Sequence, residues 1–183
     1  MQENSDEDRE RTAAPSPVVE AKGWILLAAE LPVTDVEARM AVLRTLETLG
    51  AVALSEGVYL LPESKASREA FSRLADRIRR AGATAHVFAT RTLDTAETVD
   101  LVALFDRNPR YAAIIKTVES LRAGFGIANP SAIAAVLAKQ RRDLQQVIAV
   151  DFFASRLRNE AERVLGRCER LMRKVGATPA VPQ

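Results

Sequence analysis

Apolar and polar positions near the start of the chain follow two different periods. Residues 24–29 form a compact apolar run that Pro32 ends, and this length favours a buried strand over a helix. From Thr34 to Gly50, apolar residues recur every three or four positions, which is typical of a helix with one apolar stripe. Thr34 and Glu37 have the spacing of a capping box. We therefore expect a strand followed by an amphipathic helix that Gly50 ends.

The next part of the chain predicts a hairpin, a second helix and a further strand. Residues 51–54 and 58–62 are largely apolar on either side of Gly57, which can adopt the positive φ that a tight turn requires. A helix is expected from about residue 67 to residue 82, and residues 83–92 alternate with the period of a strand. The resulting order, βαββαβ, is that of a ferredoxin-like fold.

Beyond residue 93 the pattern predicts only helices. Asn108-Pro109 interrupts a helix that resumes over residues 110–122. Asn129-Pro130 combines an N-cap residue with a proline in the first helical turn, which marks the start of another helix. The fold class expected for the whole chain is therefore α+β, with a ferredoxin-like domain followed by a C-terminal helical hairpin or bundle.

The last helix has apolar residues at alternating spacings of four and three, which resembles a heptad pattern. Two interpretations remain. The favoured one is an antiparallel hairpin packed within its own chain, and the other is a contact between the two chains of a dimer. The residues concerned are Leu157, Ala161, Val164, Cys168, Leu171 and Val175.

Composition divides the chain into four parts. Residues 1–21 are acidic and then rich in Ala, Pro and Ser, which predicts a disordered arm. The ferredoxin-like domain is expected over residues 22–93 and the helical region over residues 94–176, followed by a disordered tail over residues 177–183. The N-terminus has no apolar stretch typical of a signal peptide, so we expect a cytoplasmic protein with no membrane partner.

The residue types that usually carry catalysis are few. His86 is the only histidine and is expected in a strand beside Phe88, where a structural role is favoured because no partner is placed to orient it. Cys168 is the only cysteine and falls on the apolar stripe of the last helix, which predicts a small core residue. The sequence contains no GxSxG, HExxH, P-loop or GxGxxG motif. We therefore expect a binding protein with no catalytic residue, no metal and no cofactor.

Basic residues are the strongest functional signal. The formal net charge is only +2, but the acidic arm leaves a more basic remainder. Most of its cations are arginines, whose planar guanidinium binds phosphate or another tetrahedral oxyanion bidentately. Three interpretations stay open: contacts to a DNA backbone, convergence on a small oxyanion, and local ion pairs that solvate helix faces. The basic groups lie within residues 68–80, 139–142 and 156–174.

Several stretches of the chain together resemble the N-terminal domain of the ChrB family. The resemblance runs from about residue 23 to residue 174 and rests on residues 24–32, Arg39, Arg44, residues 49–51, 57–62 and 104–107, Arg110-Tyr111 and residues 151–153. ChrB proteins are chromate-responsive transcriptional regulators associated with chromate-efflux operons. Full-length members carry a further C-terminal domain, so the resemblance implies a chain that corresponds to the N-terminal domain without it.

The hairpin motif also resembles the central domain of PaaX-type repressors, which is similar in turn to the CRISPR-associated Cas2 fold. This leaves a metal-dependent nuclease as an alternative function. Such chemistry requires clustered carboxylates. The chain has Glu30, followed by Leu31-Pro32, where the Cas2 family places an aspartate at the end of its first strand. We therefore do not transfer nuclease activity across this difference.

The resemblance implies a chromate-responsive regulatory protein of a chromate-resistance operon. Its expected partners are operator DNA upstream of chromate-resistance genes and chromate or a related oxyanion. Chromate is a tetrahedral dianion, which suits arginine ligands. Arg39, Arg44, Arg68 and Arg110 accompany the resembling motifs and are the expected ligand or DNA contacts. A homodimer and a non-catalytic protein-interaction module remain as alternatives.

Overall fold

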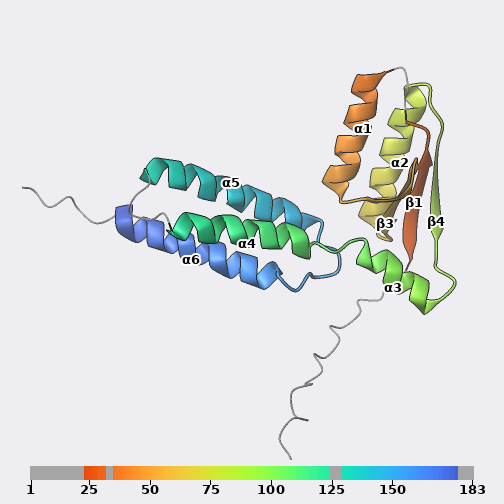
Figure 1. The fold of residues 1–183 in the computed structure, drawn as a ribbon. Helices are drawn as coiled ribbons and strands as arrows, with labels where there is room; N and C mark the ends of the chain where they lie inside the picture. Colours follow the sequence, from red (N-terminus) through yellow and green to blue (C-terminus); the bar gives the residue numbers. More distant parts are fainter. Residues whose placement is uncertain (1–22, 32–34, 124–128, 177–183) are drawn as a thin grey trace, which may run out of the picture.

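The computed structural model describes residues 23–31, 35–123 and 129–176. The predicted acidic arm (residues 1–21) and C-terminal tail (residues 177–183) lie outside the described residues. Figure 1 shows an α+β lobe and a helical lobe, which follow one another along the sequence. The strands are β1 (Trp24–Ala29), β2 (Val52–Ser55), β3 (Val58–Pro62) and β4 (Ala85–Thr90), and the helices are α1 (Val36–Leu49), α2 (Lys65–Arg80), α3 (Thr95–Ala103), α4 (Asn108–Ala123), α5 (Pro130–Ala149) and α6 (Arg158–Gly176).

The described residues form one four-stranded sheet with the order β2-β3-β1-β4, and all of its pairings are antiparallel. This is the topology of a ferredoxin-like fold, so the predicted fold class is confirmed. Gly57 makes the β2–β3 turn with a φ of 76°, as the sequence predicted. A Cβ at this position would come within 2.6 Å of the Ala29 carbonyl oxygen, so glycine is required for space as well as for backbone conformation.

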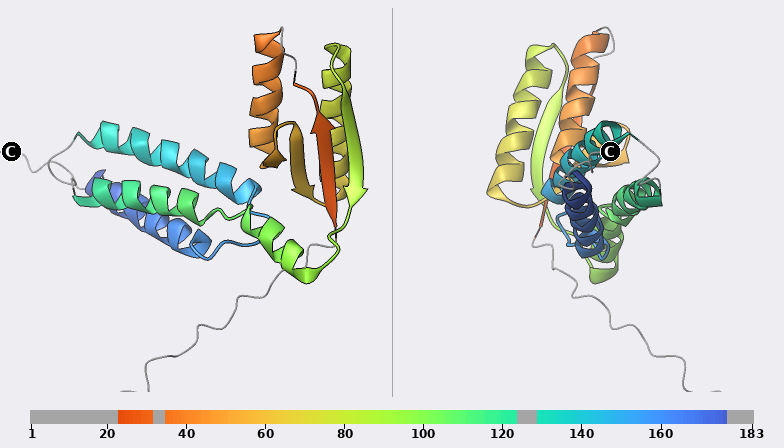
Figure 2. Two further views of the ribbon diagram at one scale, coloured as in Figure 1. Left: turned by 45° about the vertical axis from the view of Figure 1, so that its right-hand side comes forward. Right: turned by 90° about the vertical axis from the view of Figure 1, so that its left-hand side faces the viewer.

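Helices α1 and α2 lie side by side over one face of the sheet (Figures 1 and 2). Ile25 and Leu27 of β1 are fully buried and lie in one hydrophobic cluster with Phe71 and Ile78 of α2. Residues alternate across a strand, so the neighbouring positions point to the other face. On that face, the Phe88 side chain of β4 is 52% exposed.

The structure defines the residues that cap the first two helices. Asp35 caps α1 and accepts a hydrogen bond from the Ala38 amide, whereas Thr34 lies outside the described residues. Ser64 caps α2 by accepting from the Ser67 amide, so this helix begins at Lys65 rather than near Ser67. Thr34 and Asp35 are neighbours that both offer a capping oxygen, which is why the sequence alone did not identify the cap of α1.

Helices α4, α5 and α6 pack against one another in a bundle that extends away from the sheet (Figure 1). Asn108-Pro109 opens α4 instead of interrupting a helix, since proline fits the first turn. None of the helices in the described residues combines the length and apolar character needed to cross a membrane.

The apolar face of α6 packs within its own chain, as the favoured interpretation predicted. Ala161, Leu165 and Cys168 are buried against α4 and α5, whereas Leu171 is 38% exposed. Leu165 therefore takes a core position that the strict heptad pattern did not contain. The side chain of Val175 lies outside the described residues.

Candidate anion- and nucleic-acid-binding surfaces

The structure distributes the predicted contact arginines over both lobes. Arg44 is exposed on α1, and Arg68 forms a 2.6 Å ion pair with Glu63 at the start of α2. Arg39 lies close enough to Tyr59 for its charge to oppose the rise in the Tyr59 pKa that burial causes. Arg110 lies in the helical lobe, at the surface between α4 and α5. The four do not converge on one pocket, and their role as ligand or DNA contacts stays a prediction.

Local ion pairs engage many of the basic residues, as one of the open interpretations anticipated. Pairs exposed to this degree contribute about 0–1 kcal/mol each to stability and are screened by salt. Arg141 differs from the others because it joins two helices, with Nε and Nη2 both donating to the Glu169 carboxylate. The paired cations are Arg68 with Glu63, Arg73 with Glu69, Arg79 with Asp76, Lys139 with Asp143, Arg141 with Glu169 and Arg158 with Glu162.

A groove between α1 and α2 is bordered by exposed arginines. It consists of two hollows of about 200 and 260 Å³ that adjoin at Arg77, which lines both. The floor is mostly apolar, and Arg73 and Arg80 line one hollow each. Every charged residue that lines either hollow is an arginine. We call this feature the α1–α2 groove.

The spacing of these arginines was visible in the sequence. Arg73, Arg77 and Arg80 follow one another at intervals of four and three, which places them on one side of a helix. The contact residue expected within this basic cluster is Arg68, which the structure pairs with Glu63. Neither Arg77 nor Arg80 forms an ion pair with another described residue.

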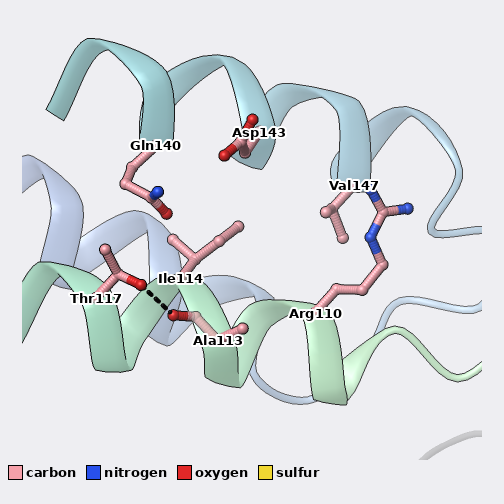
Figure 3. A pocket seen from close by; sticks show the side chains of 7 residues that line it. All are labelled: Arg110, Ala113, Ile114, Thr117, Gln140, Asp143 and Val147. Carbon is pink, nitrogen blue, oxygen red and sulfur yellow. Dashed lines mark hydrogen bonds between the residues drawn. The ribbon is translucent and has the colours of Figure 1, made fainter. Parts of the chain in front are cut away.

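The α4–α5 groove has a different character (Figure 3). It has a volume of about 260 Å³, and Arg110 lies at the end nearest Val147. Gln140 lines the other end and is only 8% exposed, and its side chain forms no hydrogen bond with another described residue. Asp143 lines the groove between them and forms a 2.5 Å ion pair with Lys139. The groove therefore contains both signs of charge.

Arg107 connects the two lobes from the turn before α4. Its Nη2 donates a 2.9 Å hydrogen bond to the carbonyl oxygen of Gly50, and its guanidinium carbon lies 5.9 Å from the centre of the Phe105 ring. Its backbone amide donates to the Ser155 hydroxyl. Burial lowers the pKa of Arg107, and the nearby charge of Arg110 acts in the same direction. The side chain is thus a structural link between α1 and the helical lobe.

Aromatic and apolar contacts complete the junction between the lobes. The Trp24 and Phe105 rings stack with their centres 5.7 Å apart, and Phe153 packs against both. Gly50 ends α1 with a φ of 71°, and a Cβ there would lie 2.5 Å from the Cβ of Val150. The segments that carry the family resemblance, around residues 50, 105 and 152, therefore meet at this junction.

The remaining residues considered for catalysis or metal binding make contacts that are typical of structural roles. Glu30 accepts a 2.9 Å hydrogen bond from the Thr84 hydroxyl. His86 is exposed beside Phe88, with their ring centres 6.3 Å apart. Cys168 is buried, which raises the pKa of its thiol. Among the described residues, no three His, Cys, Asp or Glu side chains gather closely enough to hold a metal ion.

These features define an α+β domain with a helical extension and arginine-bordered grooves. The family model described as "Protein ChrB, N-terminal" matches residues 39–178, and the chain belongs to this family. It is also 29% identical over 139 residues to Protein ChrB of Cupriavidus metallidurans (strain ATCC 43123 / DSM 2839 / NBRC 102507 / CH34). That alignment covers 76% of this chain and 43% of the relative, so the chain spans less than half of the relative's length. No solved structure matches the chain.

Proposed function

We propose that the chain is a chromate-responsive regulatory protein associated with chromate resistance, which binds DNA and an oxyanion through its arginines. The observation that carries the proposal is the match to the ChrB N-terminal family over residues 39–178. The α1–α2 groove supports DNA binding, because Arg77 and Arg80 form no ion pair with another described residue and can neutralise backbone phosphates. The proposed role includes no catalytic step.

Metal-dependent phosphodiester cleavage has less support. Glu30 is at the end of the sheet where a metal-binding carboxylate would be needed, but it accepts a hydrogen bond from the Thr84 hydroxyl. No cluster of metal-ligating side chains accompanies it in the described residues. Two-metal chemistry requires several carboxylates around the scissile phosphate, so we do not propose it.

The proposal is tested by titrating fluorescent DNA from upstream of the chromate-resistance genes with the full chain, with and without chromate. A scrambled duplex of equal length is the matched control for sequence preference. We expect the upstream DNA to bind more tightly than the scrambled one, and chromate to weaken that binding. Equal binding of both duplexes, unmoved by chromate, would contradict the proposal.

A further inference from the structure

We propose that the α1–α2 groove is the surface that contacts the DNA phosphate backbone. This inference rests on the proposed function and adds the place where the DNA binds. It concerns Arg73, Arg77 and Arg80 of α2, which line the two adjoining hollows. None of them was among the contact arginines expected from the sequence.

The sign of the charges around the groove favours a negatively charged partner. A concave surface with walls of low polarity and one sign of charge concentrates the electric field and attracts an oppositely charged partner. The charged residues that line the α1–α2 groove are all arginines. The carboxylate of Glu69 forms a 3.6 Å ion pair with Arg73 at one end, whereas Arg77 and Arg80 form no ion pair with another described residue and keep the middle and the other end positive. The α4–α5 groove differs, since Asp143 lies in it together with Arg110.

The length of the arginine row favours a long, polymeric partner. Arg73 and Arg80 are seven residues apart, so the row extends about 10 Å along α2. A duplex carries one phosphate charge per roughly 1.7 Å of its axis, so about six phosphate charges lie along such a length. A single tetrahedral oxyanion is too small to engage a row of this length, and this favours a polymeric polyanion over chromate as the occupant.

A second arginine row provides a comparison within the same chain. Arg163, Arg167 and Arg170 of α6 have the same spacing as the α2 row. Glu160 and Glu162 lie close to Arg163 on α6, as Glu69 lies close to Arg73 on α2, but the α6 arginines line neither hollow of the α1–α2 groove. Equal spacing with different surroundings makes the α6 row a matched control.

Arg77 and Arg80 also have a structural role that the test must separate from DNA binding. They lie in the last turn of α2, where positive charge interacts favourably with the helix dipole. A purely structural role would affect the free energy of unfolding and leave DNA affinity unchanged. Both quantities are therefore measured for each variant.

The experiment compares wild-type protein, Arg77→Ala/Arg80→Ala and Arg163→Ala/Arg167→Ala in DNA titrations over a salt series. Each double variant removes two positive charges. The groove variant is expected to bind at least about tenfold more weakly, with a slope of log affinity against log salt that is shallower by about 2. The α6 variant is expected to bind like the wild type.

Wild-type affinity in the groove variant, or a greater loss in the α6 variant, would overturn the assignment of the surface. Either result leaves the proposed regulatory function standing, because the wild-type protein still binds DNA. Failure of the wild-type protein to bind any duplex is a separate outcome that contradicts DNA binding itself. The two failures are therefore distinguishable.

Discussion

The Tyr111 hydroxyl donates a 2.9 Å hydrogen bond to Oδ2 of Asp151, which lies 40 residues further along the chain. Tyr111 is fully buried, and the same carboxylate also accepts bonds from the backbone amide and the hydroxyl of Ser155. Burial, followed by the bond to Asp151, raises the pKa of Tyr111. The pair therefore fixes the first turns of α4 to the segment that precedes α6.

Tyr111→Phe is expected to lower the free energy of unfolding by about 1.5–3 kcal/mol, the usual value for a hydrogen bond to a charged group. The phenyl ring keeps the packing of the buried side chain. Urea unfolding followed by circular dichroism measures the change. Ser120→Ala is the control, because Ser120 bonds only to the Lys116 carbonyl one turn earlier on an exposed face. Equal stability of Tyr111→Phe and the control would show that the bond to Asp151 contributes nothing.

Gly50→Ala tests the close contact between α1 and the helical lobe. The substitution places a Cβ 2.5 Å from Val150 at a residue with a φ of 71°. Left-handed backbone and overpacking together predict a loss of roughly 2–4 kcal/mol in unfolding free energy. Gly82→Ala is the matched control, since Gly82 has a φ of 80° with nothing within 4 Å of the added Cβ. The difference between the two variants, measured by urea unfolding, isolates the contact with Val150, and no difference would refute it.

Arg107→Met should weaken the connection between the lobes. The variant keeps an apolar stem against Phe105 but leaves the Gly50 carbonyl without its Arg107 donor. We expect one calorimetric unfolding transition for the wild-type protein and a broadened or divided transition for the variant, because the lobes lose a shared interaction. Arg44→Met is the control, since Arg44 is exposed on α1. An unchanged transition in Arg107→Met would contradict the structural role assigned to this side chain.

We predict that the contribution of Cys168 to the stability of the protein falls at alkaline pH. Burial raises the pKa of its thiol above the ordinary value of 9.0, so folding favours the protonated form. Its contribution to stability is therefore complete below about pH 9 and is lost as pH rises through the folded-state pKa. Urea unfolding of the wild-type protein and of Cys168→Ala at pH 7 and pH 10 measures this. The stability advantage of the wild type should shrink at pH 10, and a constant difference would be evidence against the shift.

The elements of the α+β lobe could be predicted from the sequence because each depends on a few neighbouring residues. The turn at Gly57 and the apolar run of β1 each follow from a few neighbouring residues, and together they fixed the order βαββαβ. Helix starts were less accurate, as Asp35 and Ser64 show, because more than one residue can cap the same turn.

The grooves and the junction could not be predicted in the same way. Arg107 bonds to Gly50, 57 residues away, and nothing in the local sequence specifies that pairing. The arginine row of α2 was visible as a spacing, but its relation to α1 depends on how the two helices pack on the sheet. Packing also explains why Leu165 rather than Leu171 joins the core of the helical lobe.

The most direct test of the regulatory role adds chromate to a preformed complex of the protein with its upstream DNA, followed by fluorescence anisotropy. Sulfate at the same ionic strength is the control, because it has the same charge and shape and screens phosphate contacts equally. We predict that chromate releases the DNA at concentrations where sulfate has no effect. Equal responses to both anions would mean that the protein does not sense chromate and would contradict the proposed function.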